Sequence, residues 1–587
     1  MIKTLIGIVL FLIPFLWILK FRYWKLGFFY VLSFMIGFEL VVALITQLFG
    51  IFNYGVVLGL HILLAGFVLF KTDWSLVEKC FKKIRVDWVF LFVVLILILS
   101  LFSVHYDYTG VVTSTTESYS SVENLEYSYP YFSDEWSAVA LTKYSIDSGK
   151  LPLKNPLWHN VRFPNFEFAF HSFASELIVL FDLDPVTQYP VLSLFFGLII
   201  CLLVYFLLRF NGIGKFGSAI AALSLIYIVN GANLPGLWTF IPLIMGLICM
   251  LLGLIFISVN DKKAVLGISV LILLFYPPLF VIFSGALLFY LGFKNKRSFK
   301  KNFLFYLLVC IGVTILLAGF VLLAGLEISS LFSLIFSKLF YETFTTGAIP
   351  DFSIWKVVPV LSLFFFFWGV IRVWKEKKYW FIVSVVLGLV FWVVYSFVTK
   401  RIIIEYERVV LTTSVLVIFI SGFGIDSFFK VVQNVLGKKF RIIIFILIML
   451  VFLIGSFSYT QREDWKELKL EFVSTGEMLE PASPANVYLN KDDLKLFEGI
   501  SEKRFLSHPW KGLVIGVSTS NYPLETKTST LTNQVLRYNL FKNSGCEEKI
   551  RLVSEFEIDY VYVPAFECTG FEFVGVSEEG FALYKIE

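Results

Sequence analysis

Two adjacent carboxylates, Asp134 and Glu135, are the most prominent residues in this chain that could do chemistry. A carboxylate can accept a proton from a reacting hydroxyl, and acidic oxygens are also ligands for metal ions. The pair follows Ser133, a good N-cap residue, at the start of a stretch with helical spacing that ends near Gly149. Acids in the first turn of a helix also favour the positive end of its dipole, so a purely structural reason for the pair stays open.

Three cations, Lys400, Arg401 and Arg408, lie in a short connection between two apolar segments. The topology derived below places this connection outside the cell, where short loops carry few cations. Such an exception needs a counter-anion. The neighbouring Glu405 and Glu407, lipid headgroups and a phosphorylated substrate are all candidates.

Four further residues have both a functional and a structural interpretation. His159 and His171 could hold a metal with the carboxylates or contact a substrate, although their aromatic neighbours favour simple packing. Lys527 lies in the hydroxyl-rich run 521–530, which could face an acceptor or form a solvated loop. Glu39 lies deep in an apolar run, where a carboxylate indicates either a functional site or a polar contact between helices.

The six cysteines are too few for a disulfide scaffold. They have no CxxC or other metal-ligand spacing, so they indicate no metal site. Cys546 and Cys568 both lie in the C-terminal tail. They could form a disulfide if the tail lies outside the reducing cytoplasm.

The composition excludes an ordinary soluble protein. The chain has 587 residues, of which 58% are hydrophobic and 16% are charged, and its mean hydropathy is +0.82. Apolar runs repeatedly reach the length of a membrane span, so we expect an α-helical polytopic protein of the cell membrane. The absence of a basic stripe with interleaved aromatic residues excludes nucleic-acid binding.

The basic loops predict about 14 transmembrane helices. Short basic loops stay in the cytoplasm, so the region 264–293, which has basic residues on both sides, must cross the membrane twice. The sequence Tyr276-Pro277-Pro278 lies midway and would break the helix, and Tyr276 is a candidate substrate contact. With this pair, the short basic loops share one side, and both termini are predicted to be extracytoplasmic.

Three regions are expected. Residues 1–87 would form three N-terminal transmembrane helices, and residues 88–459 a transmembrane core with a long external loop, 105–188. Within that loop we predict two amphipathic helices on the membrane surface, over 133–150 and 166–180. Residues 460–587 hold 14 Lys/Arg and 21 Asp/Glu. They predict a soluble α/β domain with strands at 513–517, 560–563, 571–576 and 582–586.

This layout resembles the GT-C superfamily of membrane glycosyltransferases, which includes the protein O-mannosyltransferases, the lipid A aminoarabinose transferases and the oligosaccharyltransferase catalytic subunits. The resemblance rests on Asp134-Glu135 in the first external loop, on the two interfacial helices, on the broken pair around Tyr276-Pro277-Pro278 and on the α/β tail. It covers residues 88–587. The chain has no WWDYG-like motif, which argues against an oligosaccharyltransferase proper.

The resemblance implies a function and roles for the acids. Asp134 would be the catalytic carboxylate, and Glu135 a second carboxylate or a metal ligand. The donor would be a polyprenyl-phosphate-linked sugar, transferred with inversion to an acceptor glycan, lipid or protein on the extracytoplasmic face. The donor phosphate would be bound by Arg408, Arg401 and Lys400. Some members use a divalent cation such as Mg or Mn and others do not, so a metal cofactor stays open.

A membrane transporter or lipid flippase is the main alternative. Transporters usually carry charges or broken helices at mid-membrane around a substrate path. Here Glu39 and the Tyr276-Pro277-Pro278 break are the features that fit this reading.

Overall fold

The computed structural model describes the chain except for short segments and three longer ones. The residues outside the description are 1, 21–23, 76–86, 107, 114–118, 126–129, 131–132, 159–160, 163–164, 229–235, 295–298, 324–353, 398–403, 459–488, 490, 527–535 and 578–579. His159, Lys400, Arg401 and Lys527 therefore lie outside the described residues, and their suggested roles stay predictions.

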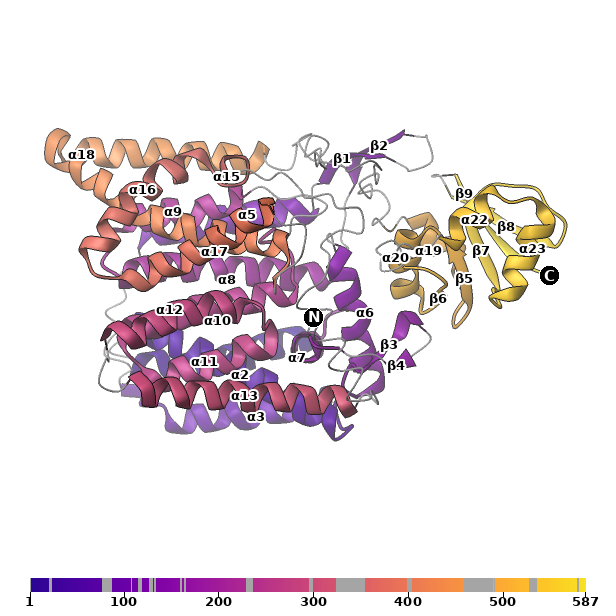
Figure 1. The fold of residues 1–587 in the computed structure, drawn as a ribbon, viewed down its shortest axis with the longest axis horizontal. Helices are drawn as coiled ribbons and strands as arrows, with labels where there is room; N and C mark the ends of the chain where they lie inside the picture. The colour runs from indigo at the N-terminus through magenta and orange to yellow at the C-terminus, as the bar shows by residue number, and fades with distance from the viewer. Residues whose placement is uncertain are drawn as a thin grey trace.

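Most of the chain forms one helical bundle, to which a smaller C-terminal domain is attached (Figure 1). The bundle helices are α1 (Ile2–Leu12) with the 3-10 helix η1 (Ile13–Lys20), α2 (Trp24–Leu48), α3 (Tyr54–Lys71), α5 (Trp88–Tyr106), α8 (Tyr189–Phe210), α9 (Lys215–Ser224) with η3 (Leu225–Tyr227), α10 (Pro242–Val259), α11 (Lys262–Phe275), α12 (Leu279–Lys294), α13 (Phe299–Leu323), α15 (Ile354–Val357), α16 (Val360–Lys375), α17 (Tyr379–Phe397) and α18 (Tyr406–Ser458). Helix α18 consists of two helical segments that meet at Gly437, whose backbone is not helical.

Six of the described helical segments are long and apolar enough to cross a membrane, judged by length and composition. They are Ile2–Leu19, Leu26–Leu48, Tyr54–Lys71, Tyr189–Phe210, Pro242–Val259 and Phe299–Leu316. The chain is thus a multi-pass membrane protein, as its composition predicts. The count of fourteen spans stays a prediction, because several of the remaining apolar helices are shorter.

The predicted helix break is present in the structure. Helix α11 ends at Phe275 and α12 begins at Leu279, so the proline pair lies in the turn between them. Helix α10 approaches this turn closely at Gly246, where an added Cβ would lie 2.8 Å from the Cβ of Tyr276. Glycine therefore allows the turn to pack against α10.

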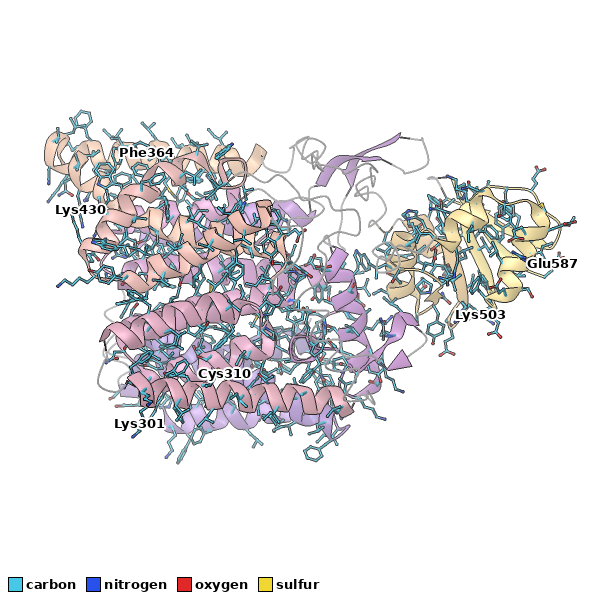
Figure 2. All side chains as sticks on the ribbon, viewed as in Figure 1. Lys301, Cys310, Phe364, Lys430, Lys503 and Glu587 are labelled. Atoms are coloured by element: carbon cyan, nitrogen blue, oxygen red, sulfur yellow. A yellow bond between two sulfur atoms is a disulfide. The ribbon has the colours of Figure 1, made fainter. Side chains whose placement is uncertain are left out.

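The end of the bundle away from the tail holds a cluster of charged groups. Asp426 of α18 accepts hydrogen bonds from Arg372 of α16 at 2.7 Å and from the Gly214 backbone amide, before α9, at 2.9 Å. It also pairs with Lys430 at 2.9 Å. Figure 2 shows Lys430 and Lys301 at this end, opposite the tail. Basic residues thus gather at one end of the bundle, in the pattern from which the topology was predicted.

The segment between α5 and α8 contains two short hairpins and two helices. These are the strands β1 (Tyr108–Thr113) and β2 (Tyr119–Leu125), helix α6 (Ser133–Ser148), the strands β3 (Lys154–Asn155) and β4 (Val161–Arg162) around η2 (Pro156–Trp158), and helix α7 (Phe168–Phe181). Both predicted helices are therefore present.

Their position on the membrane surface stays a prediction, but the apolar face of α7 is covered by protein. Nearly every residue of α7 is buried, and the helix packs against α1, α2, α3, α6 and α11. Helix α6 packs against α7 on one side and against the tail helix α20 (Pro509–Thr519) on another. The N-terminal helices cover the apolar surface of α7 that the amphipathic pattern assigned to lipid.

The tail is an α/β domain, as predicted. Its sheet has the order β6-β5-β7-β9-β8, in which β6, β5 and β7 run parallel and β9 is antiparallel to both of its neighbours. The elements are α19 (Lys491–Leu496), β5 (Arg504–Ser507), α20, β6 (Tyr522–Pro523), α22 (Arg537–Asn543), α23 (Cys546–Glu555), β7 (Tyr560–Pro564), β8 (Phe571–Val576) and β9 (Phe581–Ile586).

The strand predicted at 513–517 was wrong, because these residues lie in α20. Leu513, Val514, Ile515 and Val517 are all buried. A helix buried on most of its sides has the same continuous apolar run as a buried strand, so periodicity could not separate the two. Pro509 at the helix start is the local signal that favours a helix here.

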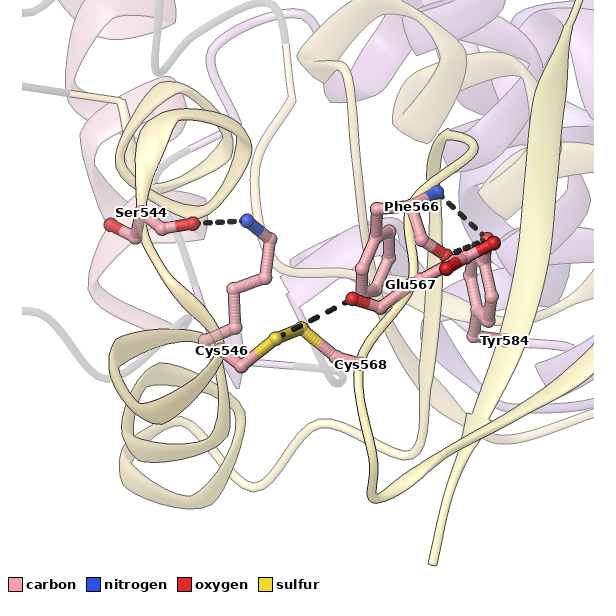
Figure 3. Close-up of a disulfide and its surroundings, with 7 residues drawn as sticks. Ser544, Cys546, Phe566, Glu567, Cys568 and Tyr584 are labelled. Carbon is pink, nitrogen blue, oxygen red and sulfur yellow. Dashed lines mark hydrogen bonds between the residues drawn. A yellow bond between two sulfur atoms is a disulfide. The ribbon is translucent and has the colours of Figure 1, made fainter.

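A disulfide joins Cys546, at the start of α23, to Cys568, in the loop between β7 and β8 (Figure 3). The two Cα atoms lie 5.6 Å apart, within the usual range for a disulfide. The bond connects the outermost helix of the tail to its sheet.

The tail also contacts the segment between α5 and α8 directly. Lys143 of α6 donates hydrogen bonds to the Val517 carbonyl at 3.2 Å and to Ser520 Oγ at 3.0 Å. The tail and α6 therefore occupy the same end of the bundle, as Figure 1 shows.

Candidate active site

The start of α18 is fixed by a pair of tyrosines. Tyr395, near the end of α17, donates its hydroxyl to the carbonyl of Ile404. Its ring meets the ring of Tyr406 edge-on, with centroids 5.9 Å apart. Both tyrosines are almost fully buried. Because Arg408 lies only two residues after Tyr406, this packing sets where its guanidinium can reach.

Arg408 reaches Asp134, the first acid of α6. Arg408 Nη2 donates to Asp134 Oδ2 at 2.9 Å, across a separation of 274 residues. The Arg408 side chain is 15% exposed and the Asp134 side chain 29% exposed. The tertiary structure thus brings together the residues for which the GT-C resemblance implies a catalytic and a phosphate-binding role, at the end of the bundle that faces the tail.

Three other groups surround the same guanidinium. Arg408 Nε is paired with Glu405, and the guanidinium carbon lies 5.6 Å from the ring centroid of Tyr276. Glu167, just before α7, is close enough to interact with Arg408 electrostatically. Tyr276, which lies in the turn between α11 and α12, therefore makes a cation–π contact with Arg408. Among the described residues, three carboxylates face one guanidinium here.

Glu135 has a different environment from Asp134. It is fully buried, and its Oε1 accepts hydrogen bonds from Ser193 Oγ and from the Phe240 backbone amide, both at 2.6 Å. Ser193 lies on α8, and Phe240 comes just before α10. These hydrogen bonds hold α6 against two bundle helices. No described contact joins Glu135 to the Arg408 guanidinium.

Aromatic packing completes this fastening. Phe240 stacks on Phe196 with centroids 4.5 Å apart and rings nearly parallel. Tyr189 donates its hydroxyl to the Phe240 carbonyl at 2.8 Å. Both backbone groups of Phe240 are thus held, one by Glu135 and one by Tyr189. These contacts hold the start of α6 in place, and Asp134 contacts Arg408 of α18 from there.

A divalent metal beside Asp134 stays a prediction, because the candidate ligand His159 lies outside the described residues. Within the described residues, no third acidic or histidine ligand comes together with Asp134 and Glu135 closely enough to share an ion. Oε1 of Glu135 is already engaged by two donors. No step of the reaction proposed below therefore passes through a metal ion at this site.

His171 is buried on α7, one helical turn after Glu167. It is 3% exposed on α7, its ring packs against Phe170, and its Nδ1 has no hydrogen-bond partner among the described residues. This burial is consistent with packing, and the suggested metal set stays a prediction because His159 lies outside the described residues.

One cluster was missed by the sequence analysis. Glu39, His61 and Glu176 offer ligand atoms that all lie within 4.8 Å of one another, and all three are buried. The analysis identified Glu39 but not its partners, because they come from three helices. The signal was present, since His61 and Glu176 are also polar residues within largely apolar helices.

Comparison with solved structures finds the oligosaccharyltransferase of the archaeon Archaeoglobus fulgidus. The structure tethered with an acceptor peptide containing the NVT sequon has a TM-score of 0.46 and 14% identity, covering 87% of this chain and 75% of that chain. The complex of this enzyme, AglB, with an inhibitory peptide and a dolichol-phosphate has a TM-score of 0.49 and 12% identity, covering 82% and 70%. The complex with Zn and sulfate has a TM-score of 0.45 and 12% identity, covering 84% and 73%.

No protein-family model and no curated protein sequence matches the chain. Because the structural likenesses have TM-scores below 0.5, we argue function from the geometry of this chain.

Proposed function

We propose that the protein is an integral-membrane glycosyltransferase that takes its sugar from a polyprenyl-phosphate-linked donor. The observation that carries this proposal is the contact between Asp134 and Arg408. It combines a proton acceptor and a phosphate-binding group at the end of a bundle of apolar helices. A polyprenyl chain confines the donor to the bilayer, so its phosphate and sugar would meet this end of the bundle from the side.

Donor binding would rearrange the ion pair. A guanidinium offers parallel donors that match two phosphate oxygens, and Arg408 now uses its donors on Asp134 and Glu405. A phosphate that takes the place of Asp134 would release this carboxylate beside the anomeric carbon. Replacement of Asp134 by the phosphate would thus bind the sugar donor and make the Asp134 carboxylate available as the base.

The transfer itself requires one bond to form and one to break. The acceptor hydroxyl oxygen attacks the anomeric carbon from the face opposite the phosphate, and its proton passes to Asp134. The bond between the anomeric carbon and the phosphate oxygen breaks, and the electron pair leaves with the phosphate. Arg408 stabilises the negative charge that develops there, and the anomeric configuration is inverted.

Glu135 would act as a positioning residue. Its two hydrogen bonds fix the start of α6 on α8 and α10. Precise placement matters because catalysis needs the reacting atoms to be held about 3–3.5 Å apart.

The extracytoplasmic face is the side we assign to this site. The tail packs on α6 and contains a disulfide, and disulfides persist in oxidising compartments. The basic residues Lys301 and Lys430 lie at the opposite end (Figure 2). The acceptor would be a glycan, lipid or protein that reaches the site from the side of the tail.

The test uses the full chain reconstituted in proteoliposomes. Polyprenyl-phosphate sugars labelled in the phosphate are supplied together with a membrane extract as the source of acceptor. We expect release of labelled polyprenyl phosphate and transfer of the sugar to the extract. If intact donor moves across the bilayer without cleavage, the protein is a flippase, and the proposed transferase function is wrong.

A further inference from the structure

The buried cluster of Glu39, His61 and Glu176 is separate from the residues around Arg408. Glu39 lies on α2, His61 on α3 and Glu176 on α7. His61 Nε2 lies 2.8 Å from Glu39 Oε2 and 3.5 Å from Glu176 Oε1. All three side chains are at most 1% exposed. The cluster is therefore a buried junction between the N-terminal helices and α7.

The tautomer of His61 is fixed by the backbone. Its Nδ1 lies 2.8 Å from the carbonyl of Val57. A carbonyl can only accept a hydrogen bond, so Nδ1 must carry the proton. The lone pair of the neutral ring is then on Nε2, which faces both carboxylates. A backbone carbonyl that orients a histidine through its other nitrogen is typical of metal-binding histidines.

The two carboxylates lack the partners that buried charges need. Within the described residues, neither oxygen of Glu176 has a hydrogen-bond partner, and Oε1 of Glu39 has none. Glu39 and Glu176 also face each other. Two adjacent buried carboxylates cannot both stay charged unless positive charge, from protons or from a cation, lies between them. One divalent cation would supply this charge and would also accept the Nε2 lone pair.

We infer that Glu39, His61 and Glu176 form a structural zinc site. In a tetrahedral zinc site with nitrogen and oxygen ligands, neighbouring ligand atoms lie about 3.3 Å apart. The separations of 2.8 Å and 3.5 Å around His61 Nε2 are close to this value. Glu176, whose two oxygens have no hydrogen-bond partner among the described residues, can bind through both, which gives a distorted four-coordinate site because the oxygens of one carboxylate lie closer together than those of separate ligands.

Zinc fits this cluster better than the hard divalent cations. Magnesium usually retains several waters and calcium takes six to eight oxygen ligands, whereas these residues are buried and include an imidazole. Imidazole is a good ligand for zinc. The ion would clamp α7 to α2 and α3 in addition to their packing. This inference does not depend on the proposed transferase function, since it concerns stability.

The test measures metal in the full-length protein. The chain is purified in detergent without chelators from zinc-containing medium, and metals are quantified by inductively coupled plasma mass spectrometry. We expect about one zinc per chain in the wild type. Loss of an outer-shell partner alone lowers affinity about 10- to 100-fold, so removal of a ligand in Glu176→Gln should lower the zinc content at least tenfold.

Ser175→Ala is the matched control, because Ser175 neighbours Glu176 on the same buried helix but is not one of the three ligands. It should keep its zinc. Size-exclusion profiles and thermal unfolding show whether each variant is folded. Zinc added to chelator-treated wild type should raise its melting temperature but should leave folded Glu176→Gln unchanged.

If Glu176→Gln fails to fold, cobalt added to chelator-treated wild type provides a second readout, through the visible absorption of a tetrahedral cobalt site. Wild-type protein that purifies without metal and gives neither the cobalt spectrum nor the zinc-dependent shift would show that the cluster holds protons. That result would overturn the inference, as would wild-type levels of zinc in Glu176→Gln.

Discussion

Replacing Asp134 with asparagine separates a catalytic role of this residue from a structural one. Asparagine has nearly the same shape, and its side-chain oxygen can still accept a hydrogen bond from Arg408. The substitution removes the negative charge and the ability to take a proton at neutral pH. Arg408 keeps its ion pair with Glu405, so no cation is left alone.

The two roles predict effects of different size. The pair is partly exposed, at 15% for Arg408 and 29% for Asp134, and such pairs contribute about 0.2–1 kcal/mol to stability. We therefore expect the free energy of unfolding to fall by at most about 1 kcal/mol. General base catalysis contributes about 10²- to 10⁴-fold in rate, which is about 3–5 kcal/mol at 1.36 kcal/mol per tenfold.

The assay is release of labelled polyprenyl phosphate in proteoliposomes, with the thermal unfolding midpoint measured on the same preparation. Asp182→Asn is the control. Asp182 belongs to the same external segment and pairs with Lys3 at 3.8 Å, but no described contact links it to Arg408. It should keep the wild-type rate. A folded Asp134→Asn protein that retains more than about one tenth of the rate would contradict the assignment of Asp134 as the base.

Four further outcomes are expected. Arg408→Lys should raise the donor KM by about tenfold or more, because lysine cannot bind phosphate through a planar fork; an unchanged KM would argue against phosphate binding. Glu135→Ala should lower the free energy of unfolding by about 2–6 kcal/mol, since two buried donors, each worth about 1–3 kcal/mol, lose their acceptor. An unchanged thermal unfolding midpoint would contradict the role of Glu135 in holding α6 on α8 and α10. Cys546→Ser should remove the disulfide to Cys568, 22 residues away, and lower the free energy of unfolding of the tail by about 3 kcal/mol. Trypsin should then digest the tail faster. Digestion at the wild-type rate would contradict a stabilising role of the disulfide. Burial and nearby lysines lower the pKa of His508 to about 4. The neutral form of His508 therefore stabilises the tail above about pH 6.5, and this contribution is lost as the pH falls towards 4. The thermal unfolding midpoints at pH 5 and pH 7 should therefore differ less in His508→Gln than in the wild type.

Local pattern was sufficient to predict the elements but not their surroundings. The helices at 133–148 and 168–181 follow from N-cap chemistry and helical spacing, and the break at Tyr276 follows from the proline pair. The strand predicted at 513–517 failed because a buried helix and a buried strand share one apolar pattern. The apolar face of α7 was expected to meet lipid but is covered by other helices, because amphipathicity shows which face is apolar but not whether lipid or protein covers it.

The candidate site was predicted only in part for the same reason. The acid pair and the misplaced Arg408 are visible in the sequence, but their contact depends on how α6 and α18 pack. Glu39 was visible as an acid in an apolar run, whereas its pairing with His61 and Glu176 required three helices to meet. Contacts between distant helices have no local sequence pattern that could predict them.

By itself, the sequence determined that this is a multi-pass membrane protein with an acidic α/β tail and an acid pair in the first turn of a loop helix, because composition and periodicity act over a few residues at a time. Only the tertiary structure decided that Asp134 meets Arg408 while Glu135 is buried against Ser193. Consecutive residues on a helix point about 100° apart, so packing on one side of α6 necessarily gives the two acids different partners.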